Sequence, residues 1–319
     1  MQQRSGSVHP AWPARLHVVT GKGGTGKTTV AAALALTLAA GGHRVLLVEV
    51  EGRQGIAQLF GIEPLPYEER KVAEAEGGGE VRALAVDPES ALLEYLDRFY
   101  RLGAAGRALR RLGAIDFATT IAPGVRDVLL TGKVKEAATR TEGGHRVYRA
   151  VVLDAPPAGR IGRFLNVTTE TARLAKVGPI KTQSEGVAAL LRSPMTAVHL
   201  VTLLEEMPIQ ETADTLAELT ELRLPVGKVI INAARPPLLV EGLVSQAELR
   251  AGLAAAGLPA DPATVAGLHL ETQDYLAREQ LETRLRLEVA GLGRPVVELP
   301  LLPGGADRAG LATLAAALR

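Results

Sequence analysis

Short stretches of continuously apolar residues recur along the chain, and the segments between them carry apolar residues at helical spacing. The stretches expected to be strands are 16–20, 44–51, 81–87, 147–153, 197–204, 228–233 and 295–302. A first helix is expected after the glycine-rich residues 21–28 and up to Gly41 and Gly42, and further helices are expected at 210–222, about 240–256, 271–290 and 308–319. Strands without polar alternation are typical of a parallel sheet that is covered on both faces. The sequence therefore predicts an α/β fold, a doubly wound and mostly parallel sheet.

Other parts of the chain interrupt this alternation. Residues 1–15 contain two prolines and a tryptophan, and we expect them to form a flexible tail before a single domain at 16–319. Residues 64–80 are rich in Pro, Glu and Gly, which indicates a loop. The pattern from about 88 to 145 is helical with breaks, whereas 166–195 carries few strong signals. We expect these last two segments to form a helical subdomain inserted into the α/β domain.

Composition narrows the classes of function. The chain has 319 residues, of which 47% are hydrophobic and 3% aromatic, so its core is expected to consist of Ala, Leu and Val. A formal net charge of +1 disfavours nucleic acid as the main partner. The absence of cysteine excludes disulfides, thiolate metal sites and a cysteine nucleophile, and the six histidines show no metal-ligand spacing.

The sequence shows no sign of membrane insertion. The opening residues lack the apolar core of a secretion signal, and no apolar stretch approaches the roughly 20 residues that span a bilayer. We therefore expect no integral membrane segment and a cytoplasmic location.

Residues 21–28 read G-K-G-G-T-G-K-T and lie between the first predicted strand and the first predicted helix. This is the phosphate-binding P-loop pattern G-x-x-x-x-G-K-[ST] in the context that it requires. Glycines let backbone N–H groups point at phosphate oxygens, and the helix N-terminus adds a positive dipole end. Lys27 would bind the β- and γ-phosphates, and Thr28 would coordinate Mg²⁺. The other residues expected to contact the nucleotide here are Gly23, Gly24, Thr25, Gly26 and Thr29. The alternative is a flexible turn with two exposed lysines.

A second candidate for the metal site follows the predicted strand 147–153. This apolar strand ends at Asp154, which is the Walker B arrangement, in which a carboxylate serves Mg²⁺. An Asp at a strand end is often only a helix cap or a turn residue. Asp154 becomes a candidate because a phosphate loop precedes it in the chain.

Lys22 stands one place after the first glycine, where the general pattern asks for no particular residue. The resulting K-G-G-T-G-K-T resembles the deviant Walker A loop of SIMIBI-class ATPases. These include the septum-positioning and plasmid-partition ATPases, the nitrogenase iron protein, and the arsenite-pump and tail-anchored-protein-targeting ATPases. The resemblance implies that Lys22 reaches across a dimer interface to the partner's nucleotide. A solvated loop lysine is the alternative.

Residues 154–165 read D-A-P-P-A-G-R-I-G-R-F-L and resemble switch II of the arsenite-pump and tail-anchored-protein-targeting ATPase family, D-T-A-P-T-G-H-T-L-R-F-L. The resemblance covers residues 15–302, and the chain looks most similar to the cysteine-free paired ATPases of actinobacteria. It implies P-loop NTPase topology with ATP or ADP and Mg²⁺ as cofactors. It also implies that Asn232 contacts adenine, with Pro300 and Leu301 beside the base.

Two glutamates end the predicted strand 44–51, where ligands bind in open α/β sheets. The family carries Asp-Pro at its water-positioning site, and Glu51-Gly52 takes that place here. The extra methylene moves the carboxylate by roughly 1 to 1.5 Å, and misplacement on that scale can cost about 10²-fold in rate. We therefore expect slow hydrolysis that depends on Glu51, with Glu49 as the competing candidate. Lys22 and Lys27 complete the expected catalytic set.

Together with the resemblance, these residues favour an ATPase that works as a dimeric switch, in which the nucleotide state alters the helical subdomain that meets a client. We expect the partner to be an identical chain or a paralogous ATPase, and the client to be a hydrophobic protein. The missing cysteines disfavour arsenite pumping. The alternatives are a catalytically weak nucleotide-binding subunit of a heterodimer, a membrane- or septum-positioning ATPase, and a small-molecule kinase or synthetase.

Overall fold

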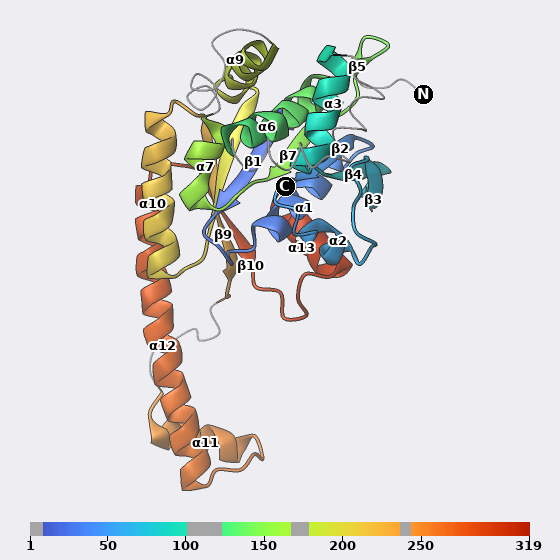
Figure 1. Cartoon of the computed structure of the whole chain (residues 1–319). Coiled ribbons are helices and arrows are strands. Elements are labelled where there is room, and N and C mark those ends of the chain that lie inside the picture. Colours follow the sequence, from blue (N-terminus) through green and yellow to red (C-terminus); the bar gives the residue numbers. More distant parts are fainter. Residues whose placement is uncertain (1–8, 101–122, 167–178, 237–243) are drawn as a thin grey trace.

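The computed structural model describes residues 9–100, 123–166, 179–236 and 244–319, and one eight-stranded sheet forms its centre (Figure 1). Along the chain, its strands are β1 (Leu16–Gly21), β2 (Arg44–Glu49), β3 (Arg70–Ala75), β4 (Gly79–Ala85), β7 (Ala150–Asp154), β8 (Thr196–Thr202), β9 (Val226–Ala234) and β10 (Val296–Pro300). Their order across the sheet is β10-β9-β8-β1-β7-β2-β4-β3. Neighbouring strands are parallel, except for the antiparallel pair β3 and β4. The prediction of a mostly parallel sheet is confirmed.

Helices cover both faces of this sheet (Figure 1). One face carries α1 (Lys27–Ala39), α2 (Gly55–Phe60) and α13 (Arg308–Ala317). The other face carries α3 (Pro88–Tyr100), α6 (Pro123–Thr139), α7 (Ala158–Leu165), α9 (Pro179–Leu191) and α10 (Glu206–Glu221), with α12 (Pro262–Gly291) alongside α10. The doubly wound arrangement is therefore confirmed.

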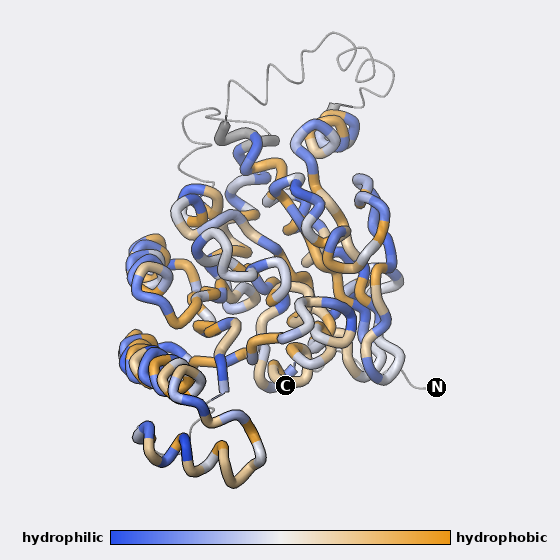
Figure 2. Tube along the Cα trace, turned by 90° about the horizontal axis from the view of Figure 1, so that it is seen from below, coloured by the Kyte–Doolittle hydropathy of each residue, from blue (hydrophilic) through white to orange (hydrophobic). Residues whose placement is uncertain are grey.

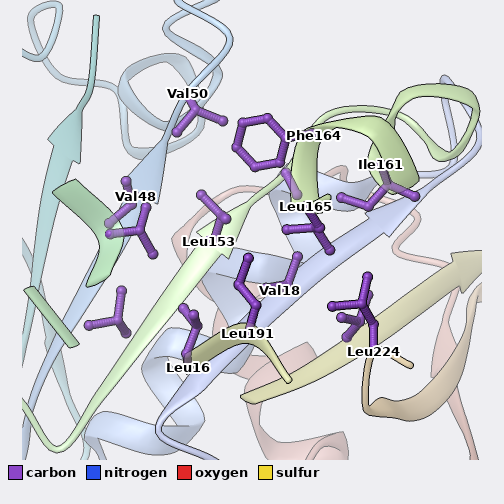
Figure 3. Packing of buried hydrophobic residues seen from close by; sticks show 14 of the residues in the cluster. Leu16, Val18, Val48, Val50, Leu153, Ile161, Phe164, Leu165, Leu191 and Leu224 are labelled. Atoms are coloured by element: carbon purple, nitrogen blue, oxygen red, sulfur yellow. The ribbon is translucent and has the colours of Figure 1, made fainter. Parts of the chain in front are cut away.

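The inner strands are mostly apolar because both of their faces are buried. In β2, Val45 packs under α1 and Leu46 packs on the opposite face, and neither is exposed to solvent. Figure 3 shows the cluster on that opposite face, where Val18 of β1 and Leu153 of β7 lie close to Leu165 of α7. Figure 2 shows hydrophobic residues along the central strands and mixed positions on the outer helices. This packing fixes the strand ends at which the candidate site lies.

Several short elements, among them α7, were not expected from the sequence. Residues 64–80 were expected to be a loop, but they contain β3 at the edge of the sheet, where polar residues such as Arg70 and Lys71 face solvent. Helix α2 has six residues, which is too few for a helical period to stand out. A two-stranded hairpin, β5 (Thr141–Glu142) and β6 (His145–Arg146), lies within the segment that was expected to be helical.

Residues 9–15 do not behave as the flexible tail that the sequence suggested. The Trp12 side chain is buried, and its Nε1–H donates a hydrogen bond to the Leu318 carbonyl at 2.7 Å. Lys228 Nζ lies 4.3 Å from the centre of the Trp12 ring. Residues 9–15 therefore pack against the α/β domain, and the domain boundary expected after residue 15 was wrong. Residues 1–8 lie outside the described part of the chain.

Helix α12 has 30 residues and is longer than the expected helix at 271–290. It begins at Pro262 because Asp261 caps it, accepting hydrogen bonds from the backbone N–H groups of Ala263 and Thr264 at 3.1 Å. Its inner half packs along α10, with Leu285 buried. Its outer half extends beyond the sheet together with α11 (Gln246–Ala255), which buries no side chain (Figure 1).

The two segments expected to form a helical subdomain are described only in part. They include α3, α6 and α9, and α6 contacts both of the others. Residues 101–122 and 167–178 of these segments lie outside the described part of the chain. Among the described residues, no helix combines the length and the apolarity needed to cross a membrane.

Candidate functional site

The glycine-rich loop connects the end of β1 to the start of α1, as the sequence predicted. Gly26 has a φ of 85°, and a Cβ added there would lie 2.3 Å from Asn232 Nδ2. A Cβ on Gly21 would lie 2.1 Å from the Val201 carbonyl oxygen of β8. Residues with side chains would therefore clash at both positions, while a left-handed φ such as that of Gly26 is costly for residues other than glycine. The loop holds its shape only with glycine at these points.

Lys27, Thr28 and Asp154 come together at the carboxyl ends of β1 and β7. Thr28 Oγ1 donates a hydrogen bond of 2.6 Å to Asp154 Oδ2 across the two ends. Lys27 Nζ donates to the Lys22 carbonyl at 3.2 Å. Thr28 and Asp154 lie 126 positions apart in the chain, so the pairing of β1 with β7 is what unites the two motifs.

Burial shifts the pKa values of Asp154 and Lys27. Asp154 is 8% exposed, and desolvation raises its pKa to about 6, with the neighbouring charge of Glu49 acting in the same direction and the Thr28 hydroxyl opposing it. Desolvation also lowers the pKa of Lys27, against the attraction of Asp154 and Glu51. A buried carboxylate is costly to ionise without a neighbouring positive charge, and a bound cation would supply that charge.

Lys22 is engaged at the other side of the loop. Its Nζ lies 3.3 Å from Glu211 Oε2 of α10, and both side chains are about one-third exposed, at 31% and 32%. The structure thus gives Lys22 a specific partner, in contrast to the freely solvated lysine that was the alternative. The pair is exposed enough for solvent to screen it, so it can be broken at small cost.

Asn232, near the end of β9, lies directly against the glycine-rich loop. Its Nδ2 donates to the Thr25 carbonyl at 2.9 Å. Pro300 ends β10, and the N–H of Leu301 donates to the Ala234 carbonyl at 2.8 Å. A cleft of about 540 Å³ begins at Pro300 and is lined by residues of α12 and the ends of β9 and β10. Among these residues, Asn232 contacts the loop and braces its backbone, whereas the contacts of Pro300 and Leu301 are with the end of β9.

The two glutamates at the end of β2 have different surroundings. Glu49 is 2% exposed, and its Oε2 accepts from the Ile56 N–H at the start of α2 at 3.1 Å. Its Oε1 is buried and has no hydrogen-bond partner among the described residues. Glu51, whose side chain is 15% exposed, lies 3.0 Å from Arg160 Nη1 and 3.7 Å from Arg53 Nε.

Arg160 is the residue at this site that sequence reasoning did not single out as functional. It is on α7, which buries Ile161 and Phe164 against the sheet while Arg160 faces solvent and reaches Glu51. The only signal in the sequence was its place within residues 154–165, the segment that resembles switch II. The partnership of Lys22 with Glu211 was likewise not predicted, although Glu211 lies in a region of family similarity.

The arrangement fits a magnesium-bound nucleotide. The loop amides and Lys27 supply donors for phosphate oxygens, while Thr28 and Asp154 supply oxygen ligands for a hard cation. Mg²⁺ at phosphate sites keeps several waters and takes few protein ligands. The described residues accordingly contain no group of three or more His, Cys, Asp or Glu side chains that could hold a metal alone. The orphaned Glu49 Oε1 is a further acceptor that a hydrated cation would satisfy.

Comparisons with known proteins agree with this geometry. The family model of the anion-transporting ATPase matches residues 14–193, which include the loop, Glu51 and Asp154. ATPase BagA of Mycobacterium tuberculosis is 54% identical over 328 residues, which cover 98% of this chain and 96% of that protein. ATPase GET3 of Kluyveromyces lactis is 26% identical over 249 residues, covering 67% and 70%. The arsenical pump-driving ATPase of Escherichia coli is 26% identical over 285 residues, covering 79% and 45%.

Proposed function

The chain belongs to the anion-transporting ATPase family, and from this premise we propose that it binds and hydrolyses ATP as a dimeric switch that couples nucleotide state to a client or partner. The observation that carries the proposal is the meeting of Lys27, Thr28 and Asp154 at the carboxyl edge of the sheet. A cation, a hydroxyl and a carboxylate that lie together in this way support the binding of a nucleoside triphosphate with its metal ion.

Each residue then has a distinct task. Lys27 and the amides of the loop hold the phosphates, and Thr28 and Asp154 hold magnesium. Magnesium held there would supply positive charge that offsets the negative charge of the phosphates. Asn232, which contacts the loop, and Pro300, which lines the neighbouring cleft, are the residues proposed to meet the adenine. Glu51 orients the attacking water.

Hydrolysis is expected to be slow because Glu51 is restrained. Arg160 and Arg53 both lie within ion-pair distance of its carboxylate, so they restrain its position and compete with water for its oxygens. The same contacts favour a second candidate function, a nucleotide-binding subunit of a heterodimer whose turnover depends on its paralogue. The two differ in the turnover of the isolated chain.

Lys22 supports the dimeric part of the proposal. Its Nζ pairs with Glu211 of α10, and its side chain is about one-third exposed, so a second subunit could reach it. We propose that Lys22 exchanges Glu211 for the nucleotide of a second subunit, which is an identical chain or a paralogue. The exchange would connect the nucleotide to α10. Client binding is proposed for the helical region of α3, α6 and α9, and a hydrophobic protein segment is the client class that we favour.

The C-terminal helix disfavours a membrane-positioning ATPase. A helix that lies on a membrane needs an apolar face that is free to enter it. Leu311, Leu314 and Leu318 are at most 2% exposed and pack in the cluster beneath α1, so the apolar face of α13 is already used.

The proposal is tested by measuring mass and turnover together. Light scattering should show a larger mass with magnesium and a non-hydrolysable ATP analogue than without nucleotide. Phosphate release should be slow in the isolated chain and should fall by about 10²-fold in Glu51→Gln. A mass that never changes would contradict the dimeric switch. Turnover of Glu51→Gln at the wild-type rate would contradict the role of Glu51.

A further inference from the structure

Glu49 is the most deeply buried carboxylate at the candidate site. It lies opposite Asp154 in the register of the parallel strands β2 and β7. Residues in register on neighbouring parallel strands point to the same face of a sheet. Glu49 and Asp154 therefore both point toward the face that α1 and α2 cover, where Thr28 also lies.

One oxygen of Glu49 is satisfied and the other is not. Oε2 accepts from the Ile56 N–H, while Oε1 is buried and has no hydrogen-bond partner. A buried acceptor without a donor is costly, and so is a buried hydroxyl without an acceptor. Neither the ionised nor the neutral form of the carboxyl group therefore satisfies Oε1 among the described residues. A donor or a cation from outside the chain would satisfy it.

The nearest polar groups of the site have other partners. Thr28 Oγ1 donates to Asp154, and Lys27 Nζ donates to the Lys22 carbonyl. The carboxylates that attract Lys27 are Asp154, Glu51 and Glu211, and Glu49 is not among them. No described hydrogen bond or ion pair joins the free oxygen of Glu49 to the phosphate-binding lysine.

We propose that Glu49 is a further residue of the magnesium site, whose Oε1 accepts hydrogen bonds from water bound to the metal while its Oε2 holds the first turn of α2. This inference rests on the proposed function. Glu51 lies in the short segment between Glu49 and Ile56. Metal loading would therefore fix that segment at its two ends and position Glu51 for its water. Glu49 is a positioning residue, since it touches neither the phosphates nor the attacking water.

The test compares the affinity for a non-hydrolysable ATP analogue in magnesium with its affinity in EDTA. The dissociation constant in EDTA divided by the dissociation constant in magnesium measures how strongly the metal supports nucleotide binding. Glu49→Gln keeps the volume of the side chain and an oxygen that can accept from the Ile56 N–H. Loss of an outer-shell partner typically costs about 10 to 100-fold in metal affinity, so the ratio should fall by that factor while the affinity in EDTA changes by less than about twofold.

Glu51→Gln is the matched control because it removes the same charge two residues away. It should lower turnover and leave the ratio close to the wild-type value. A wild-type ratio in Glu49→Gln would overturn the inference. An equal fall in both variants would also overturn it, since the effect would then be one of general charge. Absence of nucleotide binding by the wild-type protein in both buffers would contradict the proposed function instead.

A crystal structure of the wild-type protein with magnesium and the analogue tests the same point if Glu49→Gln does not fold. The expected result is a metal-bound water within hydrogen-bond distance of Glu49 Oε1. An Oε1 that bonds only to protein groups in that complex would overturn the inference.

Discussion

His199 Nε2 lies 3.0 Å from His17 Nδ1 in the interior of the molecule, and the surrounding bonds assign the protons. His17 Nε2 must donate to the Ala14 carbonyl, because that oxygen can only accept. His199 Nδ1 must accept from the Lys228 N–H. His199 therefore donates from Nε2 to His17 Nδ1, and both rings are neutral. A proton added to either ring has no acceptor in this chain of bonds.

This pair predicts a loss of stability in acid. Burial lowers the pKa of His17 from 6.5 to about 4, and burial together with the charges of His17 and Lys228 lowers the pKa of His199. The unfolded chain thus binds more protons than the folded chain between these values. The free energy of unfolding should fall by roughly 3 kcal/mol from His17 alone as the pH drops from 7 to 4.

Urea unfolding at several pH values measures this dependence. His17→Gln should flatten the profile, whereas His145→Gln, on the exposed β5–β6 hairpin, should leave it unchanged. An equally steep profile in His17→Gln would show that other groups control the acid sensitivity.

Gly26→Ala is expected to remove nucleotide binding and to lower stability. Its Cβ would lie 2.3 Å from Asn232 Nδ2, and the φ of 85° costs a residue with a Cβ roughly 1 to 2 kcal/mol. Calorimetric titration with the ATP analogue and thermal unfolding measure the two effects. Gly252→Ala is the control, since it lies within α11 with no atom near its added Cβ, and it should stabilise that helix slightly.

Thr28→Ala is expected to weaken the support that magnesium gives to nucleotide binding. It removes a proposed metal ligand and leaves the buried Asp154 without its 2.6 Å hydrogen bond. We expect a loss of metal affinity of about 10 to 100-fold, and a destabilisation of roughly 1 to 3 kcal/mol from the unsatisfied carboxylate. Thr220→Ala, on the exposed face of α10, should change neither value. An unaltered magnesium dependence in Thr28→Ala would remove Thr28 from the metal site.

Lys22→Ala is expected to reduce turnover without weakening the binding of nucleotide to the isolated chain. A cation supplied from a partner subunit contributes about 10³ to 10⁵ in rate for related phosphoryl-transfer enzymes. Lys71→Ala removes an exposed lysine paired with Glu74 and serves as the control.

A mixture of two inactive variants distinguishes action within a subunit from action between subunits. In a dimer of Lys22→Ala with Lys27→Ala, one loop keeps its own Lys27 and faces the Lys22 of the other chain. Mixing should therefore restore part of the turnover. No recovery in a mixture that forms dimers would place Lys22 within its own site.

The sequence predicted the parts of the site that local patterns encode. The loop at 21–28 and the strand that ends at Asp154 follow from residue order, and the parallel pairing of their strands brings Thr28 to Asp154. Family membership, which the sequence also indicated, is confirmed by the match to residues 14–193. The roles of Glu51 and Asn232 stay predictions.

The features of the site and the fold that the sequence did not predict depend mostly on contacts between segments that are far apart in the chain. Nothing near Lys22 indicates Glu211, and nothing near Glu51 indicates that α7 would direct Arg160 toward it. The prolines beside Trp12 suggested a tail. The contact that holds this segment could not be predicted locally, because the acceptor of the indole N–H, the Leu318 carbonyl, belongs to the far end of the chain. Strand β3 was missed because an edge strand carries polar residues on its open side.

The extension made by α11 and the outer half of α12 has a consequence for local unfolding. Val265 is the one described residue of α11 and that half of α12 that is fully buried, whereas the inner half is fixed by Leu285, Val289 and the contact of Arg286 with Glu298. With so little buried surface, this part can open while the sheet stays intact. Its amide hydrogens should therefore exchange with deuterium early, and those around Val289 should exchange only with the sheet.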